Sequence, residues 1–187
     1  MTQPIYFTGR CLLAMPGMGD PRFERAVIAM CMHDEEGALG IDLGRTVDGV
    51  SAAEVFRQLD LEADGPAEGQ PLLQGGPVQT ERGFVIHSLD YQRSDTVDVA
   101  GRWGLTSSLS ILTDIAEGRG PENWRLALGY SGWDAGQLEE EMTRPGWLLA
   151  DCDTDVLFGE GPEHVWSAAY RSAGIAPAML SSGFGAA

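Results

Sequence analysis

Apolar positions in the first quarter of the chain fall into short runs that are typical of β-strands. Residues 5–15 combine β-branched and aromatic positions with an apolar stretch, and residues 26–32 are apolar at nearly every position. A run that is apolar throughout is typical of a strand buried on both faces of a sheet. Residues 38–43 form a third run, and the polar residues 33–37 between the last two have hairpin length. The pattern therefore predicts a strand over 5–15 and a β-hairpin over 26–43.

Helical spacing of apolar positions appears four times further along the chain. Ser51 followed by Glu54 is a capping box, and it predicts a helix that ends near Leu61. A second helix is expected after Ser107 or Ser108, with one apolar stripe made of Leu109, Leu112, Ile115 and Ala116. The last two helices are expected over 134–145, where Asp134 and Gln137 repeat the capping-box pattern, and over 163–173.

Further short apolar runs predict the remaining strands, at 72–73, 83–89, 97–99, 124–130, 147–150 and 156–158. This order is neither a strict βαβ alternation nor an all-β array. It predicts an α+β fold: a single compact domain in which helices pack around a mixed or antiparallel sheet. We expect one domain over 1–187, with its core at about 5–175 and a C-terminal tail rich in Ser, Gly and Ala. The core is expected to contain Val27, Ile28, Met30, Val85 and Leu128.

Composition narrows the class of protein. The 187 residues carry 12 basic and 28 acidic side chains, a net charge of −16, and every basic residue is an arginine. Without lysine there is no Schiff-base or Walker-type lysine. The arginines are scattered among acids and form no basic patch, so we expect no direct nucleic-acid binding. The longest apolar run is far shorter than a bilayer span, so we expect no membrane insertion and a cytoplasmic location.

Neither the cysteines nor the acidic clusters form a metal or disulfide signature. Cys11, Cys31 and Cys152 are odd in number and irregular in spacing, so we expect reduced thiols, with those in the apolar runs buried. Residues 33–36 supply ligand types, but consecutive residues in a turn do not converge on one ion. The sequence therefore predicts no metal and no cofactor.

Two motifs come close to known catalytic signatures. Gly17 and Gly19 begin a dinucleotide-binding pattern, but Arg22 takes the position of the third glycine. Ser131 resembles the serine of a nucleophile elbow, with Trp133 where the second glycine belongs. A serine nucleophile also needs a base, for which the sequence offers only His33, His87 and His164. No catalytic residue is assigned; a hydrolase or small-ligand enzyme with a site near Ser131 and a histidine stays open as the alternative.

Three chain breaks, at residues 16–22, 75–79 and 129–133, combine glycine with side chains that can contact a ligand. Each follows a predicted strand, and glycine lets the backbone approach a partner closely. If these strands are neighbours, the breaks line one surface. The candidate binding residues are Pro16, Gly17, Gly19, Asp20, Arg22, Gly75, Gly76, Pro77, Gln79, Tyr130, Ser131 and Trp133. The competing interpretation is that the glycines only permit tight turns and that Trp133 belongs to the core.

Four ordered motifs resemble the AlgH/YqgE family of small bacterial cytosolic proteins. They lie at residues 9–25, at 33–41, at 75–79 with 82–85, and at 128–133 with 136–139. The sequence departs from the family pattern at Gly44-Arg45-Thr46, where an Asn-Arg-Pro is usual, at Ala135, where a glycine is expected, and in its lack of lysine.

The resemblance implies a single α+β domain and, through the family's association with exopolysaccharide regulation, a regulatory role. It supplies no mechanism and no catalytic residues. Together with the missing catalytic motifs, it favours a non-enzymatic regulatory or interaction protein that binds an unknown protein or small-molecule partner and influences transcription only indirectly.

Overall fold

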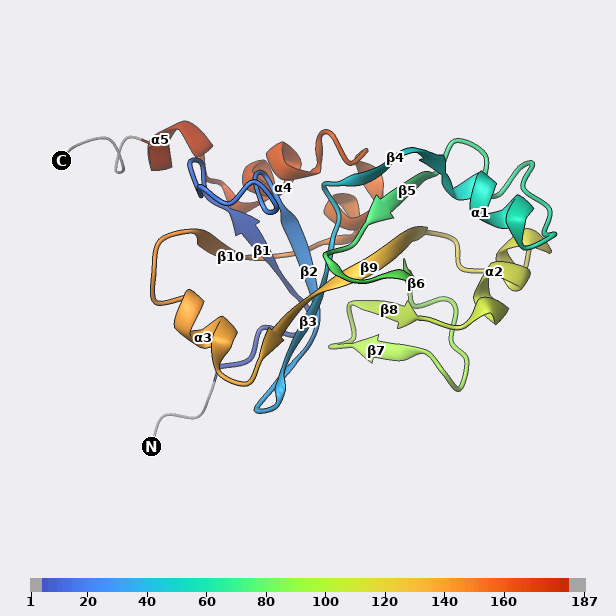
Figure 1. The fold of residues 1–187 in the computed structure, drawn as a ribbon, viewed down its shortest axis with the longest axis horizontal. Coiled ribbons are helices and arrows are strands. Elements are labelled where there is room, and N and C mark those ends of the chain that lie inside the picture. Colours follow the sequence, from blue (N-terminus) through green and yellow to red (C-terminus); the bar gives the residue numbers. More distant parts are fainter. Residues whose placement is uncertain (1–4, 182–187) are drawn as a thin grey trace.

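The computed structural model describes residues 5–181, which fold as an α+β domain with one curled sheet and helices around it (Figure 1). The strands are β1 Arg10–Ala14, β2 Val27–Asp34, β3 Gly37–Asp42, β4 Thr46–Ser51, β5 Pro71–Gln74, β6 Val78–His87, β7 Val97–Val99, β8 Trp103–Thr106, β9 Trp124–Asp134 and β10 Trp147–Asp151. The helices are α1 Ala52–Gln58, α2 Leu109–Ala116, α3 Gln137–Glu141, η1 Asp155–Gly159 (a π-helical turn), α4 Val165–Ala173 and α5 Pro177–Ser181.

Strand β9 is shared by the two halves of the sheet. Its C-terminal part pairs with β3, and through β3 the order runs on to β2, β1 and β10. Its N-terminal part pairs with β6, which leads to β8 and β7, and on its other side with β5. Only the β5–β9 pairing is parallel among the described strand pairs, so the sheet is mixed but predominantly antiparallel. The two ends of β9 therefore lie in different surroundings.

The predicted hairpin over 26–43 is confirmed. Strands β2 and β3 pair in antiparallel register, and Asp34 stands opposite Gly37 across the turn. Burial on both faces is confirmed as well: Val27 and Ala29 join one apolar cluster, whereas Ile28 and Met30 join another. An apolar side chain at every position suits a strand with packed side chains on each face.

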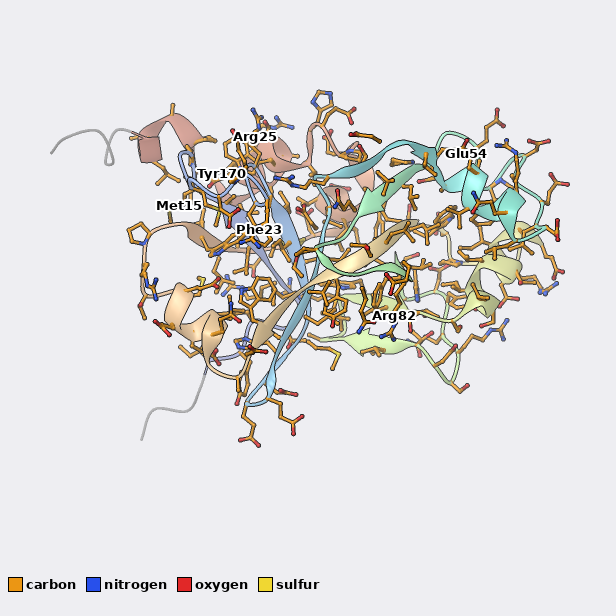
Figure 2. The ribbon with its side chains drawn as sticks, viewed as in Figure 1. Met15, Phe23, Arg25, Glu54, Arg82 and Tyr170 are labelled. Carbon is orange, nitrogen blue, oxygen red and sulfur yellow. A yellow bond between two sulfur atoms is a disulfide. The ribbon has the colours of Figure 1, made fainter. Side chains whose placement is uncertain are left out.

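Buried side chains form three clusters on the faces of this sheet. The cluster under α1 and α2 contains Val85, and Leu128 packs at its edge, partly buried. At the other end, Trp166 and Tyr170 of α4 both donate hydrogen bonds to the carbonyl oxygen of Ala14, at 2.8 and 2.9 Å. Figure 2 shows the two ends well apart, with Glu54 on α1 at one end and Tyr170 at the other.

The predicted helices are present but shorter than expected. The Ser51 N–H donates to Glu54 Oε2 at 3.0 Å, as the capping box requires. In α2 the buried residues are Ile111, Leu112 and Ile115, while Leu109 is exposed, so its place on the apolar stripe is wrong. The buried stripe of α2 therefore starts at Ile111 and not at Leu109.

Other elements differ from the sequence-based expectation. Residues 156–158 lie in the π-helical turn and not in a strand, because the Asp153 side chain accepts the backbone N–H of Val156 and starts a helical turn. Strands β4 and β8 were not expected. Helix α5 extends the folded region beyond residue 175, and its Leu180 packs against the core. Most of the predicted Ser/Gly/Ala tail, residues 182–187, lies outside the described residues.

The cysteine prediction is wrong for one pair. Cys11 and Cys152 form a disulfide, with their Cα atoms 5.4 Å apart. Strand pairing places them together. Cys11 stands opposite Ala150 in the β1–β10 ladder, and Cys152 directly follows the end of β10. A separation of 141 residues hides this proximity from the sequence. Cys31 is a free, buried thiol, and burial raises its pKa to about 12.

No described helix has the length and apolar composition needed to cross a bilayer. Within residues 5–181, no cluster of three or more His, Cys, Asp and Glu side chains has metal-binding geometry.

Candidate functional site

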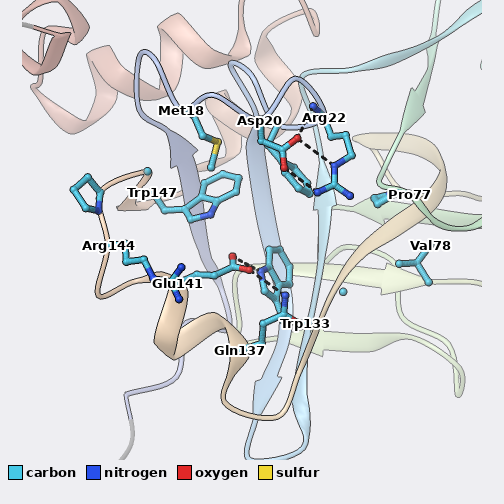
Figure 3. A pocket seen from close by; sticks show the side chains of 14 residues that line it. Met18, Asp20, Arg22, Pro77, Val78, Trp133, Gln137, Glu141, Arg144 and Trp147 are labelled. Atoms are coloured by element: carbon cyan, nitrogen blue, oxygen red, sulfur yellow. Dashed lines mark hydrogen bonds and ion pairs between the residues drawn. The ribbon is translucent and has the colours of Figure 1, made fainter. Parts of the chain in front are cut away.

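A cleft of about 540 Å³ opens where the C-terminal end of β9 meets the loop between β1 and β2 (Figure 3). Three further segments complete its walls: the start of β6, helix α3, and the turn that leads into β10. Its lining residues are Met18, Asp20, Arg22, Phe23, Pro77, Val78, Gly132, Trp133, Gln137, Glu141, Arg144, Pro145, Gly146 and Trp147. Three distant stretches of the chain, residues 18–23, 77–78 and 132–147, therefore meet at one hollow.

Three aromatic side chains line this cleft. Trp133 from β9 and Trp147 from β10 are each only 7% exposed. Phe23, from the loop between β1 and β2, packs edge-on against Trp147 with ring centroids 5.7 Å apart. Figure 3 shows both indole rings at the cleft. Fixed aromatic surfaces of this kind suit a flat apolar group, which gains burial without ordering the walls.

Helix α3 holds the Trp133 ring in place. The Trp133 indole N–H donates to Glu141 Oε2 at 2.9 Å, and the Gln137 amide donates to Glu141 Oε1 at 3.0 Å. Gln137 also accepts the backbone N–H of Asp134 at 2.9 Å, which is one half of the predicted capping box. Both oxygens of the Glu141 carboxylate are therefore engaged, and the indole orientation is fixed.

Arg22 presents a guanidinium group at the opposite rim. Its Nε and Nη2 donate to the two carboxylate oxygens of Asp20 at 3.1 and 2.9 Å, and its backbone N–H donates to Asp20 Oδ1 at 3.0 Å. The side-chain hydrogen bonds that Arg22 donates to Asp20 lower the pKa of Asp20 and raise the pKa of Arg22. The Arg22 side chain is 68% exposed, so its remaining N–H groups face solvent and the cleft. The carboxylate orients the guanidinium without enclosing it.

The glycines of the second and third breaks are explained by close backbone packing. A Cβ on Gly76 would lie 2.1 Å from the carbonyl carbon of Tyr130, and one on Gly75 would lie 2.3 Å from the Gly129 oxygen. Gly129 adopts a φ of +74°, which favours glycine. At these positions the fold requires glycine, because the backbone of residues 75–76 packs directly against that of residues 129–131.

The structure brings some of the predicted binding residues together and leaves others apart. Asp20, Arg22, Pro77 and Trp133 line the cleft. Gly17 and Gly19 border a separate hollow on the outside of the same loop, and Pro16 precedes them. Gln79 does not line the cleft; its side chain accepts a long 3.5 Å hydrogen bond from Arg82. Tyr130 is half-buried and packs edge-on against Phe84.

Ser131 does not have the surroundings of a nucleophile. It is 1% exposed, and its hydroxyl donates to the carbonyl oxygen of Gly75 at 3.3 Å. The histidines have other partners: His33 bonds to Glu139 and the Phe7 N–H, and His87 bonds to Thr106 and the Ser88 carbonyl. His164 is exposed on another face. Within residues 5–181, no histidine is hydrogen-bonded to the Ser131 hydroxyl.

Sequence reasoning missed the α3–β10 wall of the cleft. This wall is lined by Gln137, Glu141, Arg144 and Trp147. The sequence pattern singles out only Gln137 among them, as a helix-capping residue. Trp147 was assigned to a strand. An aromatic residue at the start of an edge strand, just after a Pro-Gly turn, was the available hint that a side chain faces an opening.

Comparison with known proteins bears out the family resemblance. The family model described as AlgH-like matches residues 11–178. A UPF0301 protein of Rhizorhabdus wittichii is 49% identical over 187 residues, and one of Novosphingobium aromaticivorans is 48% identical over 187 residues; each match covers 100% of both chains.

Two solved structures share the fold. The solution structure of the AlgH protein from Pseudomonas aeruginosa matches with a TM-score of 0.76 and 37% identity, covering 100% of this chain and 99% of that one. A crystal structure of a protein from Corynebacterium diphtheriae also has a TM-score of 0.76, at 23% identity, covering 97% of this chain and 94% of that one. At that identity the second match supports the fold alone.

Proposed function

The chain belongs to the AlgH-like family, and from this premise we propose that it is a non-enzymatic regulatory protein whose cleft binds a small organic ligand. The observation that carries the proposal is the aromatic cleft at Trp133, of about 540 Å³. Its volume lies within the range of small-molecule sites, which are typically apolar with a few fixed polar groups. The regulatory part of the proposal, and its cytoplasmic setting, rest on the family resemblance.

The polar groups of the cleft favour binding over covalent chemistry. Each charged side chain that lines it has a partner: Asp20 pairs with Arg22, Glu141 accepts from Trp133 and Gln137, and Arg144 pairs with Glu140. None of the carboxylates in the lining is paired with a histidine or a hydroxyl group that it would activate. Such groups orient a ligand without attacking it.

A thermal-shift screen of aromatic metabolites tests this proposal. Flat ligands are expected to raise the melting temperature of the wild-type protein and to leave that of Trp133→Ala unchanged. Leu109→Ala, at an exposed position on α2, is the matched control and is expected to respond as wild type. Mass spectrometry after incubation should recover each bound compound chemically intact. Stabilisation of Trp133→Ala by the same compounds, or turnover of a bound compound, would contradict the proposal.

A further inference from the structure

A small recess adjoins the cleft and shares Arg22, Phe23 and Pro77 with it. Its volume is about 80 Å³, and Asp42, Arg45, Gln74 and Gly76 complete its lining. Asp42 is the last residue of β3 and is 2% exposed. The recess therefore lies beside the aromatic cleft and contains a buried carboxyl group at the end of β3.

Two guanidinium groups face this recess. Arg45 Nη2 donates to the carbonyl oxygen of Pro21, which ties Arg45 to the loop that also carries Arg22. Arg45 Nε lies 3.8 Å from Asp42 Oδ2 and is buried without a hydrogen-bond partner in the described part of the chain. A buried N–H of a charged group that lacks an acceptor is costly, and a ligand oxygen would supply one.

The carboxyl group in the recess does not balance these positive charges. Burial raises the pKa of Asp42 to about 7, against the opposing effects of the Gly44 N–H, Arg45 and the Val27 N–H. The Gly44 N–H donates to Asp42 Oδ1 at 2.8 Å. Near neutral pH Asp42 is therefore protonated in a large fraction of molecules. Arg22 is paired with Asp20, so Arg45 is the arginine left facing a recess whose own carboxyl group carries less than one full negative charge.

We propose that this recess binds the anionic head group of the ligand, an oxyanion such as a carboxylate, sulfate or phosphate, while the flat body of the ligand occupies the cleft. The assignment rests on the proposed function, because the body of the ligand lies between the walls of that site. Arg45 supplies its free Nε–H, and Arg22 supplies the N–H groups that Asp20 does not use. Charge-assisted hydrogen bonds from guanidinium groups recognise planar or tetrahedral oxyanions specifically.

Inorganic sulfate tests the recess without the cleft, because it has no flat apolar body. Its charge is also constant between pH 6 and 8, so any pH dependence of binding comes from the protein. Backbone amide resonances of Gly44 and Gly76 are expected to shift with added sulfate in the wild-type protein. Arg45→Gln should weaken this binding at least about tenfold, since it removes one charge and the free Nε–H. Arg57→Gln, at an exposed position of α1, is the matched control and should bind as wild type. An equal sulfate response of wild type and Arg45→Gln would overturn the proposal.

A pair of probes separates failure of the recess from failure of the cleft. 2-Naphthoate and 2-naphthamide share a flat ring and differ in the charge of the head group. We expect 2-naphthoate to bind at least about tenfold more tightly, and we expect Arg45→Gln to abolish this preference while 2-naphthamide binding stays unchanged. Equal affinities of the wild type for 2-naphthoate and 2-naphthamide would overturn the proposed role of the recess and leave the proposed role of the cleft unchanged. Sulfate binding at Gly44 without binding of either naphthalene would support the recess and contradict the cleft.

Discussion

Two tryptophans on one strand have the same exposure but different surroundings. Trp124 and Trp133 lie at opposite ends of β9, and each is 7% exposed. Trp124 packs against Phe56 of α1, with ring centroids 5.8 Å apart, inside the cluster that α1 and α2 cover. Trp133 packs against the β1–β2 face on one side and lines the cleft on the other.

The two ends of β9 differ in what covers the tryptophan, which the exposed fraction of the side chain does not report. At the Trp124 end, apolar side chains from two helices fill the space over the strand. At the Trp133 end, α3 is only five residues long, and its polar side chains hold the indole by its N–H. We propose that β9 connects two halves: a sealed half, closed over Trp124, which stabilises the protein, and an open half at Trp133, which binds the ligand. The predictions below test that division, from the largest expected effect to the smallest.

Truncation of the two tryptophans should separate the two halves most clearly. Trp124→Ala creates a closed cavity and should lower the free energy of unfolding by about 3–5 kcal/mol. Trp133→Ala should cost at least about 1 kcal/mol less, because it enlarges an open cleft that water fills. Chemical denaturation of both variants measures the difference. Equal losses would remove the distinction between sealed and open ends.

The disulfide should stabilise the open half. Reduction of Cys11–Cys152 should lower the free energy of unfolding by about 2–4 kcal/mol, because the bond closes a long loop in the unfolded chain. Denaturant titrations with and without reductant measure the change. Protein purified without reductant and then denatured should expose one titratable thiol, that of Cys31. Three reactive thiols would show that the bond is absent.

Asp42 should make the stability of the open half depend on pH. Its pKa is raised to about 7 from the ordinary value of 3.8, so the folded protein binds a proton that the unfolded chain releases. Stability therefore falls as pH rises from about 4 to 7 and levels off above 7. Asp42→Asn lacks this loss, so its free energy of unfolding relative to wild type should rise by about 2–3 kcal/mol between pH 5 and pH 8. A pH-independent difference would contradict the assignment.

Arg22 should matter for binding and hardly for folding. Its ion pair with Asp20 is largely exposed, so Arg22→Gln should leave the free energy of unfolding nearly unchanged. Calorimetric titration with 2-naphthoate should show a loss of about tenfold in affinity, since one guanidinium of the recess is removed. Arg57→Gln serves again as the control. A large loss of stability with unchanged affinity would reverse this assignment.

Local patterns predicted much of the fold. The β2–β3 hairpin, the capping box at Ser51 and the α+β class all follow from interactions between residues close in sequence. The capping box predicted at Asp134 is wrong, because Asp134 ends β9 and Gly136 is the N-cap of α3. The breaks around Arg22, Pro77 and Trp133 were also visible, because glycine and proline mark turns in any context. Those three residues line one cleft, although Gln79, from the second break, lies outside it.

Contacts between distant segments could not be predicted. The disulfide partner of Cys11 depends on which strand pairs with β1, and Trp147 lines the cleft only because β10 takes that edge position. Asp42 lies in the strand predicted over 38–43, and the pattern does not single it out, because its burial depends on loops from distant parts of the chain. A single sequence does not encode such neighbours in a readable pattern.

The most direct test of the division along β9 is fluorine NMR of protein labelled with 5-fluorotryptophan. The chain has five tryptophans, each of which gives its own resonance, and single Trp→Phe variants assign them. On titration with 2-naphthoate, the resonances of Trp133 and Trp147 should shift together with one dissociation constant, while that of Trp124 stays in place. A shift of Trp124 with Trp133 unmoved, or no shift at either end, would contradict the account.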